Sequence, residues 1–498
     1  MNAYQNGLRL SAAGRHLAAI ECYEQALAAR PDDTKVLFAL GNTARLLDMP
    51  GPAEEFFRRV LAAEPQRIEA LVNLANLLRT RGQFDAAIAL LEPVLAHHPD
   101  ACELWLTLGS AHREKGENDL AESHYRQALA QNGGYAPALG NLADLLADKG
   151  DFETALALYD RALKSDGGNA QARLNRAVLH LLRGNLKDGW RDYTARLKIA
   201  NKVPLAEHRL ERWNGGRIKR LLVSAEQGVG DQIMFASCLP DLAARAAADG
   251  GMLLLECEPR LVSLFARSFP NVTVRPSDLQ TKAGVTTARY DWLRNAGGAN
   301  HFVEMGSVPK ILRASLEAFP QNNAYLTPDT AERAHWQGIL AEAGPGPHTG
   351  ICWRSGKSGG HRAIQYAPLD AWAEFLHDLP GTLVCAQYDA SAEEIAELEK
   401  RSGRKIFAAP GLDQKNELDR TAAMLSSLDA VVSAPTAVSW LAAGCGVTTL
   451  KILYDTSWTA FGQAHEPFAP ACLCVMPDMR GDWRDAFAKA QKILSEQP

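Results

Sequence analysis

Two acidic side chains in one short turn are the strongest candidates for chemistry in this 498-residue chain. The turn E-Q-G-V-G-D (226–231) follows an apolar stretch and carries Glu226 and Asp231. A carboxylate in such a place could take a proton from a hydroxyl group, which is general-base chemistry. Asp231 could instead cap the helix expected after the turn, because aspartate is favoured at helix N-termini. We therefore hold Asp231 as the first candidate base and Glu226 as the reserve.

A second turn, W-R-S-G-K-S-G-G-H-R (353–362), has the composition expected of a phosphate-binding loop. It combines glycines with Arg354, Lys357 and Arg362 directly after an apolar stretch. Arginine can bind one phosphate through two N–H groups, and lysine adds a point charge. His361 could bond the same ligand or lie on the surface, and the whole loop could be a solvated basic segment. The G-x-x-x-x-G-K-[ST] order is absent, which excludes a P-loop.

A third segment, S-A-P-T-A-V-S-W-L-A-A-G (433–444), joins an apolar stretch to a helix expected over 437–443. Thr436 precedes that helix, so its hydroxyl and the helix N-terminus would suit an anionic phosphate. Simple N-capping by Thr436 is the other interpretation, and the two roles can coexist. No D-x-D pair occurs in the sequence, so we predict no metal site and no cofactor.

Short apolar strands alternate with helices from residue 217 onward and would position these three turns. The pattern occurs twice, with a linker near 325–347, and predicts two α/β lobes with parallel sheets. Ligands of such sheets bind at the carboxyl ends of the strands, where the three turns fall. The expected strands are 220–225, 252–257, 272–275, 348–354, 382–387, 429–434 and 449–453, and the expected helices include 232–248, 368–378 and 483–495.

The first 200 residues instead repeat with a period of 34. One position holds a small residue in every unit: Gly7, Gly41, Ala75, Gly109, Ala143 and Ala177. Glycines at 14, 82, 116, 150 and 184 mark the turns inside the units. This is the tetratricopeptide (TPR) period, in which stacked helix hairpins form a protein-binding surface. The polar residues expected on that surface, which we take as acceptor-binding candidates, are Asn73, Asn76, Asn141 and Asn175.

Composition excludes several classes of protein. The net charge of −5 gives no basic footprint for nucleic acid. The nine cysteines are scattered, which predicts reduced thiols and a cytoplasmic protein. The N-terminus lacks the shape of a signal peptide, and no apolar run reaches the ~20 residues that span a bilayer.

The turn E-Q-G-V-G-D-Q-I, followed by Pro240, resembles the first βα turn of GT-B glycosyltransferases of the heptosyltransferase type. The resemblance implies that Asp231 is the catalytic base and that Gly228 and Gly230 contact the donor. The segment 433–444 resembles the donor loop of that group, D-T-x-x-x-H-L-A. It implies donor contacts for Ser433, Thr436 and Ser439, but Pro435 stands at the aspartate position and Trp440 at the histidine position.

The whole chain resembles bacterial fusions of TPR repeats with such a transferase, which include flagellin-modifying glycosyltransferases; O-GlcNAc transferase shares the general plan. The resemblance implies a TPR domain over 1–203 and two Rossmann-like GT-B lobes over 204–345 and 346–498, with the last helix crossing back to the first lobe.

The resulting prediction is a metal-independent protein O-glycosyltransferase that takes a sugar from a nucleotide-sugar donor. The resemblance alone implies flagellin as the acceptor protein, held by the TPR groove, and a nonulosonic acid such as pseudaminic acid as the sugar. The alternative is a non-catalytic TPR interaction scaffold with a degenerate transferase domain, which Pro435 and Trp440 favour. A transferase acting on a lipid glycan is a third hypothesis, and the acceptor-binding repeats argue against it.

Overall fold

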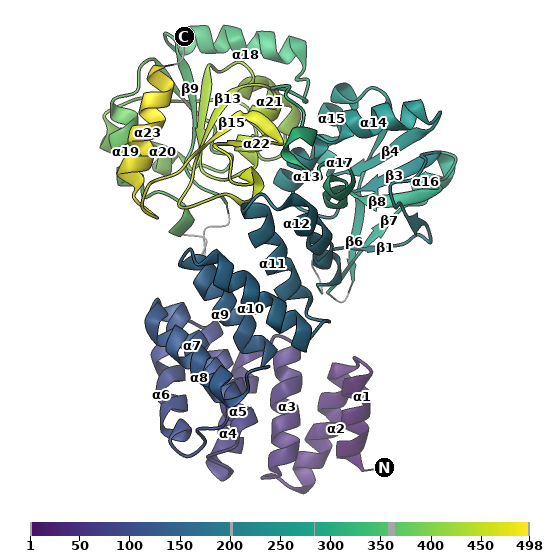
Figure 1. Cartoon of the computed structure of the whole chain (residues 1–498), viewed down its shortest axis with the longest axis vertical. Coiled ribbons are helices and arrows are strands. Elements are labelled where there is room, and N and C mark those ends of the chain that lie inside the picture. Colours follow the sequence, from purple (N-terminus) through teal and green to yellow (C-terminus); the bar gives the residue numbers. More distant parts are fainter. Residues whose placement is uncertain (1, 200–202, 283, 357–363, 497–498) are drawn as a thin grey trace. The chain divides into compact units, whose positions relative to one another are not determined.

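Each 34-residue period in the first part of the chain folds as a pair of helices joined by a short turn. The computed structural model describes residues 2–199, 203–282, 284–356 and 364–496. The chain divides into two compact units, Met1–Ala172 and Arg173–Pro498. The helices of the first unit, drawn from purple to blue in Figure 1, are α1 (Ala3–Ala12), α2 (His16–Ala29), α3 (Thr34–Leu46), α4 (Pro50–Ala63), α5 (Ile68–Thr80), α6 (Phe84–Leu95), α7 (Cys102–Lys115), α8 (Asn118–Gln131), α9 (Ala136–Asp148) and α10 (Phe152–Ser165).

The small residue of each repeat makes room for an aromatic ring of the same hairpin. A Cβ atom added to Gly41 would lie 2.7 Å from the ring of Phe57, and one added to Gly109 would lie 2.8 Å from the ring of Tyr125. Both rings are fully buried. The small residue in the sequence pattern therefore marks a contact between the first and second helix of one repeat. The predicted helical repeats are confirmed.

The turn inside each repeat needs a left-handed backbone. All five predicted turn glycines have φ between 72° and 91°. The second repeat places Asp48 at the equivalent position, with φ of 56°. Aspartate is one of the few residues other than glycine that adopt this conformation, so the turn survives there without glycine.

The second unit starts within α11 (Ala170–Leu182) and continues with α12 (Leu186–Tyr193) and the 3-10 helix η1 (Thr194–Lys198). Trp190 of α12 is buried, and its indole N–H donates to the Arg313 carbonyl at 2.9 Å. Around it lies a cluster of rings with centroids 4.9–6.5 Å apart, contributed by Tyr193, Phe235, Phe319, Trp458, Phe461 and Phe468. This aromatic cluster joins α12 to connecting segments of both of the large sheets described next.

A five-stranded parallel sheet forms the first part of the second unit, in the order β2-β8-β3-β4-β5. Its strands are β2 (Glu211–Arg212), β3 (Arg220–Ser224), β4 (Met252–Cys257), β5 (Val272–Pro276) and β8 (His301–Glu304). A small sheet in the order β1-β7-β6 lies beside it, made of β1 (Leu205–Ala206), β6 (Asp278–Lys282) and β7 (Val285–Arg289). The accompanying helices are α13 (Val229–Ala236), α14 (Leu239–Ala248), η2 (Pro259–Leu261), α15 (Val262–Ser268), α16 (Asp291–Asn295), η3 (Met305–Ser307), α17 (Pro309–Leu312) and η4 (Leu316–Ala318).

A seven-stranded sheet forms the second part, in the order β11-β10-β9-β12-β13-β15-β14. Its strands are β9 (His348–Cys352), β10 (Thr382–Cys385), β11 (Ile406–Ala408), β12 (Ala430–Ser433), β13 (Thr448–Ile452), β14 (His465–Glu466) and β15 (Ala469–Val475). All pairs are parallel except β14 with β15. Counted along the chain, the parallel strands lie in the order 3-2-1-4-5-6 of a doubly wound sheet.

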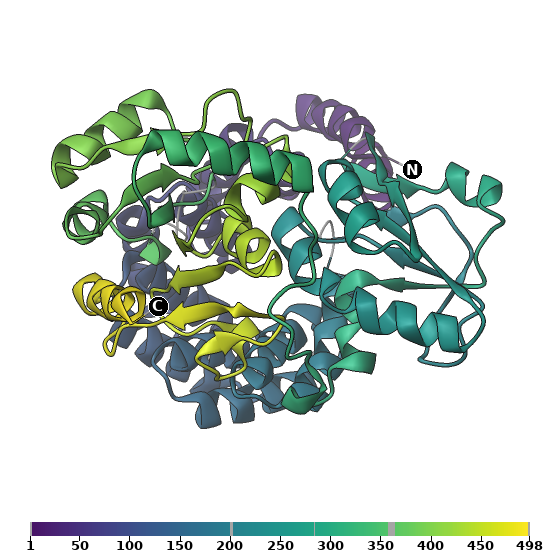
Figure 2. The same cartoon turned by 90° about the horizontal axis from the view of Figure 1, so that it is seen from above.

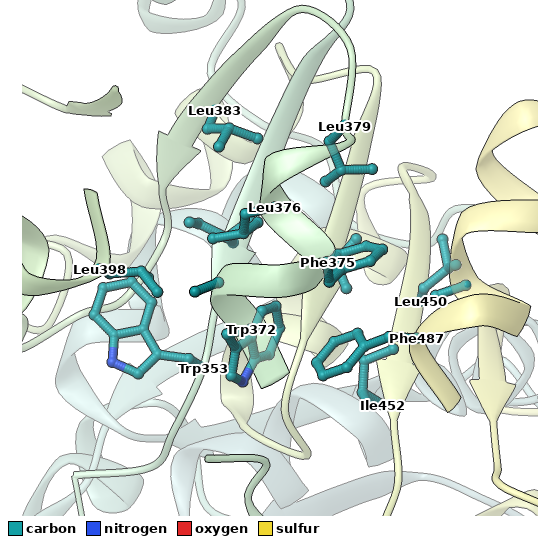
Figure 3. Packing of buried hydrophobic residues seen from close by; sticks show 14 of the residues in the cluster. Trp353, Trp372, Phe375, Leu376, Leu379, Leu383, Leu398, Leu450, Ile452 and Phe487 are labelled. Atoms are coloured by element: carbon teal, nitrogen blue, oxygen red, sulfur yellow. The ribbon is translucent and has the colours of Figure 1, made fainter. Parts of the chain in front are cut away.

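Helices cover both faces of this sheet (Figures 1 and 2). One group comprises α19 (Leu369–His377), α20 (Ala392–Ser402) and α23 (Trp483–Ser495). The other comprises α18 (Thr330–Ala343), α21 (Leu418–Leu425) and α22 (Ala437–Gly444). Under the first group, Trp372, Phe375 and Phe487 form a buried aromatic core with strand residues such as Leu450 (Figure 3).

Three expectations about the elements are wrong. The helix expected over 232–248 is two helices, α13 and α14, and Pro240 lies in the first turn of the second. The linker expected near 325–347 contains α18, whose Asp329 caps the first turn. The last helix, α23, packs on α19 and on β13 and β15 of its own sheet and does not cross back. Within the described residues, no helix is long and apolar enough to cross a membrane.

Candidate functional site

A cavity of about 1020 Å³ lies where the carboxyl ends of the two large sheets meet. In each sheet the chain reverses its direction of strand addition, between β3 and β8 in one and between β9 and β12 in the other. Ligands of doubly wound sheets bind outside the strand ends at such a reversal. The turns after β3, β9 and β12 all contribute to the wall, through 228–231, 355–356 and 435–438.

Asp231 lies in the wall of the cavity, in the first turn of α13. Gly228 is the N-cap residue of that helix, so Asp231 is the third helical residue and not the cap. Burial raises the pKa of the Asp231 carboxyl, and the Gly228 N–H and the Arg196 guanidinium only partly oppose this effect. The aspartate is therefore a partly buried carboxylate with increased proton affinity beside a large cavity, which suits a general base.

Glu226, the reserve base, forms a buried ion pair with Arg196. The Arg196 guanidinium donates to its Oε1 atom at 2.5 and 3.2 Å, and the Gly306 N–H donates to the same oxygen at 3.1 Å. Both side chains of this ion pair are at most 4% exposed. Glu226 does not line the main cavity, and proton transfer to it would have to weaken a buried ion pair. The geometry favours Asp231 over Glu226.

Two helix N-termini face the cavity. Gly228 and Gly230 lie at the start of α13, and Thr436 is the N-cap of α22, where its Oγ1 accepts from the Val438 N–H at 3.2 Å. The two helices pack on each other, and Gly230 lies next to Ala437. Free backbone N–H groups and helix dipoles at such ends attract anions.

The two serines of the predicted donor loop do not line the cavity. Ser433 is fully buried and donates to the Ala434 carbonyl at 2.7 Å. Ser439 is also fully buried and donates to the Thr436 carbonyl at 2.7 Å. Both hydroxyls hold the turn that presents Thr436, so any donor contact of Ser433 or Ser439 would be indirect.

Arg354 was predicted to bind phosphate, but its guanidinium is already neutralised. It donates to the two oxygens of Glu394 at 2.6 and 2.5 Å and to Asp389 at 3.0 Å. These carboxylates raise the pKa of Arg354 above its usual value. Arg354 is absent from the cavity wall, although the next two residues belong to it. The other predicted loop residues, Lys357, His361 and Arg362, lie outside the described residues.

A cation that sequence reasoning missed does lie in the wall of the cavity. Lys451 of β13 has a side chain only 4% exposed and forms an ion pair with the fully buried Glu466. Its ammonium lies 4.3 Å from the centre of the Trp440 ring. Burial alone would lower the pKa of Lys451, but the Glu466 carboxylate together with Cys472 and Cys474 more than offsets this effect, so the pKa is raised. The sequence signal was a single lysine inside the apolar strand T-L-K-I-L (449–453).

Aromatic and amide side chains complete the wall and also escaped the sequence prediction. Tyr388 and Gln414 follow β10 and β11, and Tyr454 and Trp458 follow β13. Polar and aromatic groups together are typical of sites for small molecules with a planar ring. They belong to no recognised motif and follow three different strands, so only the fold brings them to one cavity.

A second cavity, of about 560 Å³, meets the first at Gly228 and Glu258, which line both. Glu226, Gln227 and Gln232 contribute polar groups to it. On the side of the small sheet, it is lined by three exposed apolar side chains, Leu205, Leu279 and Val285, which are 43–62% exposed. Asp231 therefore lies close to the junction of two differently lined cavities.

The predicted acceptor-binding asparagines belong to the first helices of their repeats. Asn73 donates to Asn42 of the preceding repeat at 3.0 Å, and Asn141 donates to Ser110 of the preceding repeat at 3.2 Å. Asn76 accepts from Arg79 at 2.6 Å. Asn175 lies in α11 of the second unit. Two of these asparagines thus form hydrogen bonds between neighbouring repeats, and the role of all four in acceptor binding stays a prediction.

Comparison with known proteins supports the repeats and extends beyond them. The tetratricopeptide repeat family model matches residues 4–68, 72–137 and 141–197. Protein FlbA of Caulobacter vibrioides is 33% identical over 319 residues, which are 64% of this chain and 53% of FlbA. This chain thus spans about half the length of that relative. The alignment is longer than the repeat region, so it includes part of the sheet-containing unit.

Among solved structures, a thermophilic TPR protein of Thermus thermophilus is 27% identical, with a TM-score of 0.32; the match covers 36% of this chain and 97% of that one. PilF of Pseudomonas aeruginosa is 21% identical, with a TM-score of 0.33, covering 39% and 88%. The repeats indicate a region that binds a protein partner.

Proposed function

We propose that this chain is a protein O-glycosyltransferase of the GT-B type, in which the repeats hold the acceptor protein. The observation that carries the proposal is the large cavity at the carboxyl ends of two parallel sheets, with Asp231 and the N-terminus of α22 in its wall. One carboxylate of raised pKa and one anion-attracting helix end are what transfer from a phosphate-activated sugar requires.

In the proposed reaction, Asp231 acts on the acceptor and the N-terminus of α22 acts on the leaving phosphate. Asp231 takes the proton of an acceptor hydroxyl, and the hydroxyl oxygen forms a bond to the anomeric carbon of the sugar. The bond from that carbon to the phosphate oxygen breaks, and the phosphate leaves with the electron pair. Thr436 and the N-terminal N–H groups of α22 lie where the leaving phosphate gains negative charge. The second cavity provides room for the acceptor segment beside Asp231.

The acceptor and the sugar are proposed from the repeats and from the family resemblance. The repeat match supports a protein acceptor, and the resemblance to TPR transferase fusions suggests flagellin as that protein. The same resemblance suggests a nonulosonic acid such as pseudaminic acid as the sugar. Pro435 and Trp440 set the donor loop apart from that of heptose transferases, which favours a different donor.

A non-catalytic TPR scaffold is the second candidate, and two observations favour it. Arg354 is neutralised by Glu394 and Asp389, and Ser433 and Ser439 are buried away from the cavity. A scaffold would keep the repeats as a binding surface and use the second unit only as structure.

The decisive experiment measures the intact mass of the acceptor protein. Purified wild-type protein is incubated with flagellin and a panel of nucleotide sugars, including CMP-pseudaminic acid. We expect the mass of one or more sugars to be added by the wild type. The Asp231→Asn variant should be slower by ~10²–10⁴-fold, the usual loss on removing a general base. Asp370→Asn, which changes an aspartate 77% exposed on α19, is the matched control. An unchanged flagellin mass with every donor would support the scaffold.

A further inference from the structure

We propose that Lys451 is the cation that contacts the phosphate of the donor, in the role that sequence reasoning gave to Arg354. The inference rests on the proposed function and adds a residue that the donor-loop resemblance does not include. Three observations carry it: the position of Lys451 in the cavity wall, its unused N–H donors, and the neutralisation of Arg354.

The position of Lys451 follows from the doubly wound sheet. It lies on β13, the strand that enters the sheet directly after α22, and its neighbours Leu453 and Tyr454 also line the cavity. The Trp440 ring, from the first turn of α22, lies against the ammonium. The lysine therefore stands beside the helix whose N-terminus is capped by Thr436.

The hydrogen bonding of Lys451 is incomplete. An ammonium carries three N–H donors, and the Glu466 Oε1 atom is the only acceptor that the described residues provide for it. Buried donors nearly always have partners in protein, water or ligand. An anion in the cavity would satisfy the remaining donors of a side chain that is already ordered.

Glu466 fixes the position of Lys451. The same Oε1 atom also accepts from Ser457 at 3.0 Å and from Thr459 at 2.9 Å, two residues that line the cavity. These bonds hold the carboxylate, and the carboxylate holds the ammonium. Trp440, which replaces the donor-loop histidine, contributes a cation–π contact to the same lysine. On this account the departure from the heptosyltransferase pattern reshapes the anion site and leaves it functional.

The test compares the wild type with a variant in which uncharged side chains of similar size replace the buried ion pair. Lys451→Met alone would leave the Glu466 carboxylate buried and unpaired, and Glu466→Gln alone would do the same to the Lys451 ammonium, so either would destabilise the fold. The test variant is therefore Lys451→Met/Glu466→Gln, and its reference is the wild type. Lys405→Met removes a lysine that is 93% exposed and serves as the surface control. Thermal unfolding confirms that each full-length protein is folded.

Calorimetric titration with CMP, UDP, GDP and ADP measures affinity at low salt. We expect the double variant to bind its nucleotide about 10- to 100-fold more weakly than the wild type, the usual range for one charged hydrogen bond. Equal affinity of the double variant and the wild type would overturn the role of Lys451 and leave the proposed function standing. Loss of affinity in Arg354→Gln instead would return the role to Arg354. If the wild type binds none of the four nucleotides, both the inference and the proposed function fail.

Discussion

Replacing Trp190 with alanine should loosen both large sheets of the second unit at once. Trp190 is 2% exposed and packs against the rings of Tyr193, Phe461 and Phe468, and the Phe468 ring in turn contacts Phe235 of α13, the helix after β3. Truncating a buried tryptophan to alanine typically costs ~3–5 kcal/mol, which includes the cavity left behind. The substitution also leaves the buried Arg313 carbonyl without its 2.9 Å donor. We therefore expect the upper part of that range.

Trp190→Phe separates the two effects, because it keeps most of the buried ring and removes only the N–H donor. An unsatisfied buried carbonyl costs about 1–3 kcal/mol, so this variant should lose less stability than the alanine variant. Trp105→Ala is the matched control in the first unit, since the Trp105 indole donates to the Pro99 carbonyl at 2.8 Å but is only partly buried.

Amide hydrogen exchange followed by mass spectrometry gives the readout along the chain. Trp190→Ala should reduce protection in β3 and in β9 together, while protection in α1–α10 stays unchanged. Trp105→Ala should reduce protection around α7 and leave both sheets unaffected. Loss of protection confined to α11 and α12 in the Trp190 variant would refute the reasoning, because the aromatic cluster would then not connect the sheets.

Three further outcomes can be measured separately. Because burial raises the pKa of Asp231, the transfer rate should fall on acidification at a pH above the ~3.9 of an ordinary aspartate, as kcat/KM profiles would show. Burial raises the pKa of Glu256 to about 7, so the folded state retains a proton that the unfolded state loses, and stability falls as pH rises towards 8. Urea unfolding of Glu256→Gln should therefore show a stability gain over the wild type that is about 2 kcal/mol larger at pH 8 than at pH 5; an equal gain at both would contradict this. Gly41→Ala should cost roughly 1–3 kcal/mol by pushing against Phe57, whereas Gly140→Ala, which meets open space in α9, should stabilise by up to ~1 kcal/mol; opposite signs in thermal unfolding are the check.

The repeats were predictable because the same packing contact recurs in each unit. The small residue at Gly41 or Gly109 and the ring at Phe57 or Tyr125 are 16 residues apart in the same hairpin, so the pattern is local and recurs. The strands were predictable for a similar reason, since each is a short apolar run between polar turns. The helix α18 was missed because only Trp336 and Leu340 along it are buried, which leaves little periodicity to detect.

The charges of the candidate site were less predictable, because their state depends on partners far along the chain. The glycine-rich loop around Arg354 suggests a phosphate site. In the fold, however, Arg354 donates hydrogen bonds to the carboxylate of Glu394, which lies 40 residues later in the chain. In the sequence, Lys451 is a single lysine within an apolar strand. Its ion-pair partner Glu466 lies on a different strand, so the sequence does not show the pair. Composition shows that a cation is present, but only the fold shows whether it is already neutralised.

The same reasoning explains how a degenerate donor loop can still belong to a working site. A histidine at position 440 would offer a phosphate an N–H donor and, when protonated, a positive charge, whereas Trp440 offers only a neutral indole N–H. The tryptophan instead covers a buried lysine that has N–H groups to spare. The loop keeps Thr436 as its helix cap, and Pro435 occupies a turn position that also lines the cavity. If the double variant at Lys451 loses nucleotide affinity while Arg354→Gln does not, the altered loop and the buried ion pair form one anion site. The departures from the heptosyltransferase pattern would then indicate a different donor and would no longer argue for a scaffold.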